Sequence, residues 1–265
     1  MTNFIASASS VPVLRGLWRE YGSSMTYARP IVYQDEPLRA LQGFVDDYFR
    51  GGGLRSALDA GCGYTLPLDF SRDVHLVGLD ASPEALAKNE NIDQGIVGDI
   101  ETYPLEADAY DLILCWTVLE HLTRPGGAIA NMAHGLRPGG LLVIGIPNIW
   151  SLKGLLTKFT PHRFHVWVYR RFLGWENAGK PGFGPYPTYL RREIASDRLE
   201  RFSRTLELER VYAKTYEIEL GLPKPVAVVW TIATTLLRIV TLGRWNAAAS
   251  DHVAVFKKSS AGSGA

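Results

Sequence analysis

Cysteine is scarce in this sequence, which holds only Cys62 and Cys115 among its 265 residues. Two cysteines are too few for a disulfide framework or for a cysteine-based zinc or iron–sulfur site. Both lie in apolar stretches, and we expect them to be reduced thiols that fill space in a cytoplasmic protein.

Long apolar runs are also missing. The longest conspicuous one starts at Pro225 and is interrupted by Arg238, short of the roughly 18 to 20 residues that span a bilayer. The sequence does not open with a basic start and a sustained apolar core, so no signal peptide is evident. The stretch 225–245 is apolar nearly all round, and we expect a buried helix or a homodimer contact. The alternative is a helix that dips into a membrane surface or lines a channel for a lipid-like substrate.

Charge of one sign does not dominate either, because 28 Lys and Arg face 27 Asp and Glu, a net charge of +1. This balance excludes a globally electrostatic binder of nucleic acid or membranes. The hydrophobic fraction of 46%, with 26 Gly and 15 Pro, excludes collagen-like and disordered chains. The neutral total conceals one segment, 150–192, with eight Lys and Arg, ten aromatic residues and a single acid, a net charge of +7.

What the sequence does contain is an alternation of short apolar runs with helical patterns. The runs typical of strands buried on both faces are residues 56–59, 75–80, 95–99, 110–116 and 141–147, with further strands at 206–212 and 252–257. Ser82, Pro83 and Glu84 together indicate a helix start, and the helical stretch 126–140 ends in Gly and Pro. This alternation predicts a doubly wound α/β sheet with right-handed crossovers.

The most informative motif is LDAGCGYTLPL at residues 58–68, where a strand ends at Asp59 and glycines follow at 61 and 63. Glycine at such a turn lets a ligand approach the main chain. The second and third predicted strands end in Asp80 and Asp99, so three acids meet at one edge of the sheet, and Asp80 is placed to bind ribose hydroxyls.

The ligand predicted at this edge is not a dinucleotide or a nucleoside triphosphate. A dinucleotide fingerprint would place Gly or Ala at position 66, which is Leu66, and a phosphate loop would need G-K-[ST], which is missing. An acid beside the turn suits a cationic ligand with a ribose and an adenine, which describes S-adenosylmethionine.

With these motifs the chain resembles the class I S-adenosylmethionine-dependent methyltransferases, in the small-molecule branch related to ubiquinone- and menaquinone-type enzymes. The segments that carry the resemblance are LDAGCG (58–63), VGLD (77–80), GDI (98–100), YDLILCWTVLEHL (110–122) and GLRPGGLLVIGIPN (135–148). The resemblance implies a Rossmann-like, mostly parallel seven-stranded sheet with a cap inserted after the fifth strand, S-adenosyl-L-methionine as cofactor and S-adenosyl-L-homocysteine as product. It assigns the cofactor to Asp59, Gly61, Cys62, Gly63, Asp80, Ala81, Asp99, Ile100, Trp116 and Thr117.

Acceptor chemistry is constrained by the residues at the end of the fourth strand. Methyltransferases that act on bases often carry [DN]-P-P-[YF] there, whereas this chain has CWTV at 115–118, which leaves oxygen or carbon acceptors. A hydroxyl acceptor calls for a general base, and His121 is the first candidate, with His165 as the second. The alternative for His121 is a helix residue that never touches substrate. His162 and His165 have the spacing of a metal pair, but no carboxylate completes it, so no metal is expected.

The basic aromatic segment is expected to cover the acceptor pocket, since insertions at this place do so in the family. Aromatic faces stack on sugars or flat rings, and arginine binds phosphate or carboxylate. The alternative is a helical cap whose aromatics form its own core. The substrate-binding candidates are His162, Arg163, Trp167, Tyr169 and Tyr186.

We therefore predict an O-methyltransferase that acts on a hydroxyl of a saccharide or another natural-product small molecule. A quinone or lipid-like, lipid-linked acceptor is the first alternative, and a non-catalytic S-adenosylmethionine-binding partner subunit is the alternative of another class. No nucleic acid partner is expected, whereas peripheral membrane contact and a homodimer stay open. The predicted organisation is an N-terminal helical lid (1–52), a cofactor-binding core (53–148), a substrate cap (149–200), a part that completes the sheet and adds an apolar helix (201–258), and a disordered tail (259–265).

Overall fold

A computed structural model describes residues 36–63, 66–172, 174–180, 184–217, 222 and 224–260 of the chain. Most of the predicted N-terminal lid and of the predicted tail lies outside these residues. Of the lid, the structure describes helix α2 (Glu36–Tyr48), which packs Leu38, Leu41 and Val45 into the core.

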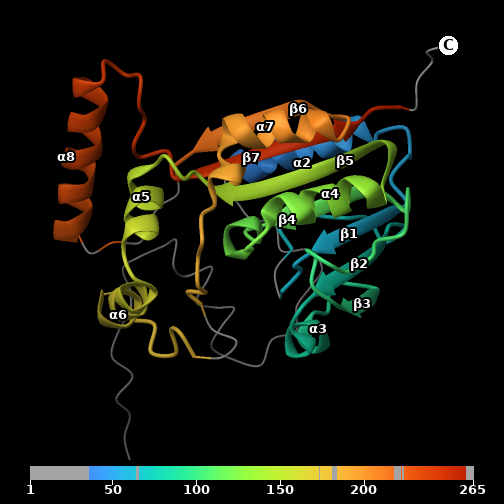
Figure 1. The fold of residues 1–265 in the computed structure, drawn as a ribbon, viewed down its shortest axis with the longest axis horizontal. Coiled ribbons are helices and arrows are strands. Elements are labelled where there is room, and N and C mark those ends of the chain that lie inside the picture. The colour runs from blue at the N-terminus through green and yellow to red at the C-terminus, as the bar shows by residue number, and fades with distance from the viewer. Residues whose placement is uncertain are drawn as a thin grey trace, which may run out of the picture.

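One seven-stranded sheet organises the described residues, in the order β3-β2-β1-β4-β5-β7-β6. The first five strands pair in parallel, and β7 runs antiparallel to both β5 and β6. The strands are β1 (Ser56–Ala60), β2 (His75–Asp80), β3 (Gln94–Val97), β4 (Tyr110–Trp116), β5 (Leu136–Pro147), β6 (Leu208–Tyr216) and β7 (Asp251–Lys258). The prediction of a doubly wound, mostly parallel α/β sheet is confirmed (Figure 1).

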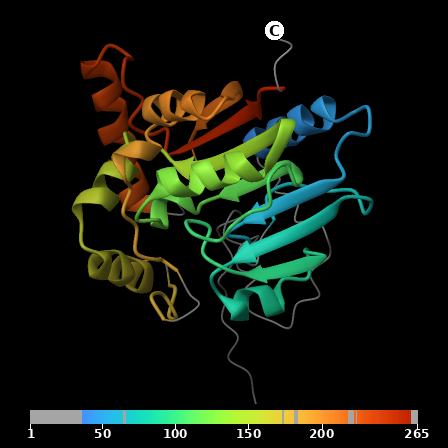
Figure 2. The same cartoon turned by 45° about the vertical axis from the view of Figure 1, so that its right-hand side comes forward.

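The strands bury both faces, as their uninterrupted apolar sequences predict. In β4, Leu112 and Leu114 belong to one buried cluster, while Ile113 and Cys115 belong to the cluster on the opposite face. Helix α2 covers the first face, and α4 (Pro125–Gly135) and α7 (Ser196–Thr205) cover the second (Figures 1 and 2). The remaining described helices are α3 (Pro83–Lys88), η1 (Leu119–His121), α5 (Leu152–Phe159), α6 (His162–Phe172), η2 (Arg192–Ile194) and α8 (Lys224–Val240).

Some helices and strands begin or end at other residues than predicted. The predicted helical stretch 126–140 ends earlier, at Gly135, because Leu136 pairs with Tyr110 and opens β5. Strand β3 stops at Val97, two residues before Asp99. Strand β6 begins later than predicted and runs on to Tyr216 beside β7. The predicted helix start at Ser82 is confirmed, since its hydroxyl accepts a hydrogen bond from the Ala85 amide at 3.2 Å.

The interpretation of the apolar stretch 225–245 as a buried helix is wrong. It forms helix α8 and the turn after it, and within α8 only Thr234 is buried. Apolar side chains such as Val229 (65% exposed) and Ile239 (63% exposed) face outward. Among the described helices, none is long and apolar enough to cross a membrane.

Candidate active site

A cavity of about 1030 Å³ opens where the parallel strands β1, β2, β3 and β4 reach their carboxyl ends. In an open parallel sheet this is the edge at which ligands bind. One part of the cavity is lined by the loops that follow these strands. The other part is lined by residues of the inserted segment after α6, among them Trp175, Tyr186 and Tyr189.

The glycine loop after β1 is shaped by conformation and close contact. Gly61 has a φ of +79°, and a β-carbon there would lie 2.4 Å from Cγ2 of Val118. Gly63 has a φ of +46° and open space around its Cα. Both positions therefore require glycine, one for fit and both for backbone geometry.

Asp80 holds this loop in place. Its Oδ2 accepts a hydrogen bond from the Gly63 amide at 2.9 Å, and its Oδ1 accepts one from the Ser82 amide at 2.8 Å. Asn89, which the sequence patterns did not single out, donates from Nδ2 to the Gly63 carbonyl at 3.0 Å. The carboxylate at the tip of β2 thus fixes the glycine loop as well as bordering the cavity.

Two buried groups behind the loop have strongly raised pKa values. Asp59 is 3% exposed, and burial, with a smaller contribution from the Asp80 charge, raises its pKa to about 8. Burial and the Asp59 charge raise the pKa of the Cys62 thiol to about 12, so Cys62 is not a nucleophile at neutral pH.

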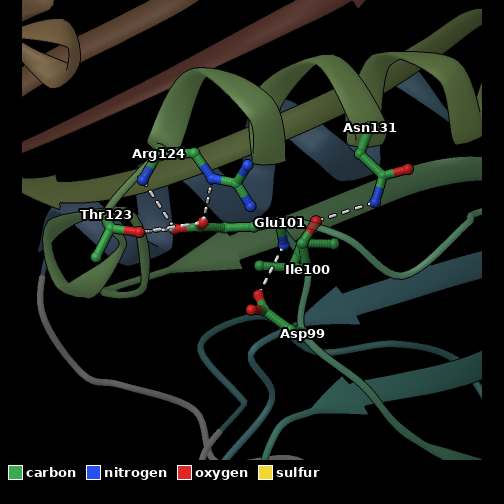
Figure 3. A network of polar contacts seen from close by, with 6 residues as sticks. All are labelled: Asp99, Ile100, Glu101, Thr123, Arg124 and Asn131. Carbon is green, nitrogen blue, oxygen red and sulfur yellow. Dashed lines mark hydrogen bonds and ion pairs between the residues drawn. The ribbon is translucent and has the colours of Figure 1, made fainter.

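The loop after β3 is tied down by a polar network (Figure 3). Asn131 on α4 donates from Nδ2 to the Ile100 carbonyl at 2.9 Å, and Asp99 Oδ1 accepts from the Glu101 amide at 2.8 Å. The Glu101 carboxylate accepts hydrogen bonds from the Arg124 amide (2.8 Å), from Arg124 Nε (3.2 Å) and from the Thr123 hydroxyl (3.3 Å). Burial alone would raise the pKa of Glu101, but these hydrogen bonds outweigh it and lower the pKa.

The cavity lining at the end of β4 includes Trp116, Thr117 and His121. Trp116 lies directly over Gly145 of β5, where a β-carbon would be 2.3 Å from its Cε3. Thr117 has a φ of +54°, a left-handed conformation that turns the chain sharply into η1. The close approach and the turn set the position of η1 beside the cavity.

His121 projects from η1 into the cavity lining and is held by the inserted segment. Its Nδ1 lies 2.8 Å from the Pro187 carbonyl, and a carbonyl can only accept, so Nδ1 carries the hydrogen. The Nε2 of the neutral ring is then the acceptor, and the ring meets Tyr186 edge-on at 5.9 Å between centroids. Burial lowers the pKa of His121 despite this hydrogen bond, so the imidazole is neutral at pH 7.

Glu120 is the second buried acid at this edge. Its side chain is 3% exposed, its Oε1 lies 3.9 Å from Nε2 of His121, and its buried Oε2 has no hydrogen-bond partner among the described residues. Burial raises its pKa to about 8, and repulsion from Asp251 adds to the shift. In the sequence, Glu120 stood out only as the residue before His121 in YDLILCWTVLEHL, and nothing else there indicated a buried acid.

The structure brings together all ten predicted cofactor residues, which line the cavity with His121 and Tyr186. It does not bring His162, Arg163, His165, Trp167 or Tyr169 into the lining, and the prediction that they face the acceptor is corrected. His165 is the clearest case, because it lies on α6 with its Nε2 2.6 Å from the Thr160 hydroxyl. Tyr169 packs edge-on against Trp175 at 5.0 Å.

Trp175 and Tyr189 are lining residues that we did not single out. Their only signal in the sequence was membership of the aromatic segment.

Among the described residues, no group of three or more His, Cys, Asp and Glu could hold a metal ion. The described lining contains Asp59, Asp80, Asp99 and Glu176 but no Lys or Arg. Such a donor set suits a cationic ligand with hydroxyl groups and disfavours a phosphate-bearing one.

Comparisons with known proteins agree with this arrangement. A family model described as a methyltransferase domain matches residues 58–144. The chain is 40% identical over 108 residues to an uncharacterised 37.1 kDa protein of transposon Tn4556 from Streptomyces fradiae, and 33% identical over 116 residues to a ubiquinone biosynthesis O-methyltransferase of Burkholderia vietnamiensis. These alignments cover 37% and 40% of this chain, and 31% and 50% of the relatives' own lengths.

The fold comparison extends over more of the chain. A crystal structure of a S-adenosylmethionine-dependent methyltransferase from Archaeoglobus fulgidus superposes with a TM-score of 0.50 at 17% identity, covering 84% of this chain and 94% of that one. At this identity the superposition establishes the shared fold.

Proposed function

We propose that the protein is a class I, S-adenosylmethionine-dependent methyltransferase that transfers a methyl group from S-adenosylmethionine to a hydroxyl oxygen. The match of residues 58–144 to a methyltransferase-domain model supports this proposal. The observation that carries the proposal is the cavity that joins the ten cofactor residues to a neutral histidine. S-adenosylmethionine supplies, when bound, an electrophilic methyl group on a sulfonium. The acidic lining without a described Lys or Arg fits that cation.

Each part of the lining has a role in this proposal. The glycine loop and Asp59 receive the methionine end, Asp80 binds the ribose hydroxyls, and Asp99 with Ile100 borders the adenine. His121 accepts the hydroxyl proton at Nε2 while the new oxygen–methyl bond replaces the sulfur–methyl bond, which leaves S-adenosylhomocysteine. Alignment of donor and acceptor supplies the rest of the catalysis.

Two acceptor classes are consistent with the acceptor part of the cavity. Trp175, Tyr186 and Tyr189 offer aromatic faces that suit a saccharide or another natural-product ring. A quinone or lipid-like phenol is the second candidate, favoured by the ubiquinone-biosynthesis role of the Burkholderia relative and by the lack of a described cation in the lining.

The direct test is calorimetry with S-adenosylmethionine and S-adenosylhomocysteine, followed by turnover with labelled donor on glycosides and on polyprenyl phenols. Methylated product identified by mass spectrometry decides between the acceptor classes. Binding of neither nucleoside would refute the proposal, and binding with no turnover on any acceptor would favour a non-catalytic subunit.

The affinity for S-adenosylmethionine is expected to rise with pH between 6 and 8, by up to about tenfold per unit. Burial and Asp80 raise the pKa of Asp59 to about 8, so below pH 8 the carboxyl is protonated and a cation must displace the proton to bind. Calorimetry in buffers of different ionisation enthalpy measures the proton released. Asp59→Asn should flatten the profile. If the affinity of this variant still rises with pH, the titrating group is another one, and Glu120 is the first to test.

Glu101→Ala is expected to raise the Kd for S-adenosylmethionine roughly five- to tenfold, with turnover at saturating donor unchanged. The carboxylate anchors the loop after β3 to the start of α4 through several hydrogen bonds, and charged hydrogen bonds contribute about 1.5 to 3 kcal/mol each. Glu106→Ala is the matched control, since Glu106 is an exposed acid of the same connection. An equal loss of affinity in both variants would rule out this anchoring role.

A further inference from the structure

Helix α8 presents an apolar face to the outside of the molecule. It stands beyond the edge of the sheet next to α5, with α6 at the same end (Figure 1). The chain after α8 returns to α5, where Trp245 Nε1 donates to the Trp150 carbonyl at 2.6 Å. We call the exposed apolar side chains of this end the apolar platform, and they are Val226, Val228, Val229, Ile232, Leu236, Ile239, Val240 and Leu242, with Leu156 and Phe159 of α5 and Phe164 of α6.

The exposure of α8 is not that of an ordinary surface helix. Residues Ala227, Trp230, Thr234, Leu237 and Thr241 recur every three or four positions and are buried or half-buried, so this stripe faces the protein. A surface helix would carry polar residues on the opposite face, whereas α8 carries Val229, Ile232 and Leu236 there. Exposed apolar side chains gathered on one face of a helix in this way mark an interaction site.

Exposed arginines lie on or next to the helices that carry the platform. Arg163, Arg170 and Arg171 are exposed on α6, and Arg238 and Arg244 are exposed at the end of α8. The sequence contains no acid between Glu219 and Asp251. None of these arginines lines the cavity as the structure describes it.

From this combination we propose that the apolar platform docks on the surface of a bilayer that contains anionic lipid. Apolar side chains enter the boundary between headgroups and acyl chains, and arginines beside them reach the phosphates. A second copy of the chain is a poorer occupant, because two such platforms would bring together surfaces that both carry exposed arginines. Docking does not depend on the proposed methyl transfer.

The apolar platform and the cavity are connected by the segment that follows α6. Residues 174–180 and 184–189, which follow α6, supply Trp175, Tyr186 and Tyr189 to the cavity lining. If the proposed function holds, an acceptor held in the membrane would enter from this side.

Sedimentation of the full chain with vesicles tests the proposal. We expect binding to phosphatidylcholine vesicles that contain phosphatidylglycerol, at least tenfold weaker binding to phosphatidylcholine alone, and weakening by salt. The triple variant Val229→Ser, Ile232→Ser, Leu236→Ser should lose at least tenfold in affinity. Its control is Val97→Ser with Val211→Ser, which removes exposed apolar side chains of β3 and β6.

Two double variants test whether vesicle binding requires the arginines beside the platform. Arg163→Glu with Arg171→Glu should weaken binding roughly tenfold or more, whereas Arg39→Glu with Arg72→Glu, at exposed positions of α2 and of the loop before β2, should not. Circular dichroism and nucleoside binding check that each variant is folded. Equal binding to both vesicle types, or no binding by the wild type, would overturn the proposal. So would a dimer in light scattering that the triple variant dissociates, because a second copy would then cover the platform.

Discussion

Asp80→Ala is expected to raise the Kd for S-adenosylmethionine about a hundredfold. The substitution removes the carboxylate assigned to the ribose hydroxyls and also the acceptor of the Gly63 and Ser82 amides, at 2.9 and 2.8 Å. Losing hydrogen bonds to a charged group costs about 1.5 to 3 kcal/mol each, and roughly 2.7 kcal/mol corresponds to a factor of 100. Calorimetry with S-adenosylhomocysteine measures the same loss without turnover.

Asp111→Ala is the matched control for this variant. Asp111 Oδ2 also accepts two backbone amide hydrogens, from Arg55 and Ser56 at 2.9 Å each, but at the amino end of β1, away from the cavity. We expect Asp111→Ala to lower the melting temperature and leave the Kd of the donor within a few-fold. Comparable Kd values for Asp80→Ala and the wild type would disprove the ribose assignment.

His121→Ala is expected to lower kcat by about 10² to 10⁴ while the Kd of S-adenosylhomocysteine stays within about threefold, the range that a positioned general base contributes. The Nδ1 hydrogen bond to Pro187 leaves Nε2 free to accept a proton, and burial lowers the pKa of the ring. In the wild type, activity should therefore rise with pH below the ordinary histidine range and be level at neutral pH, because the active form is the neutral one.

The pH profile separates a base from a structural role. The rise with pH should vanish in His121→Ala, whose residual rate would follow the ionisation of the acceptor itself. His134→Ala, an exposed histidine of α4, should reproduce the wild-type profile. A His121→Ala protein with full turnover at pH 7 would exclude His121 as the base.

That the predicted cofactor residues line one cavity could be foreseen from the sequence because they lie in local motifs. Asp59, Gly61 and Gly63 share one turn, and Asp80 and Asp99 follow neighbouring strands, so parallel pairing alone brings them to one edge. The backbone around Gly61 demands glycine, which makes the signal visible in a single sequence.

The lining that the inserted segment contributes could not be predicted to the same extent, because its geometry depends on packing between distant segments. The composition of 150–192 marked the segment, yet the direction in which α6 faces follows from contacts such as Tyr169 against Trp175. This contact places Tyr169 inside the cap, and Arg163 and His165 lie outside the cavity lining. The sequence could not decide between a buried and an exposed α8 for a related reason, since an apolar helix has the same residue pattern whether the protein core or a membrane surface covers it.

The hydrogen bond between His121 and Pro187 joins η1 to the inserted segment, and two backbone hydrogen bonds between described residues do so as well. The amides of Tyr189 and Leu190 donate to the Glu120 carbonyl at 2.8 and 3.3 Å. The segment that lines one side of the cavity is therefore bonded to the same short turn that carries His121, the proposed general base. A chimera that exchanges the whole segment to change acceptor preference would also release His121, whereas exchanging only Trp175 and Tyr186 would leave these three bonds in place.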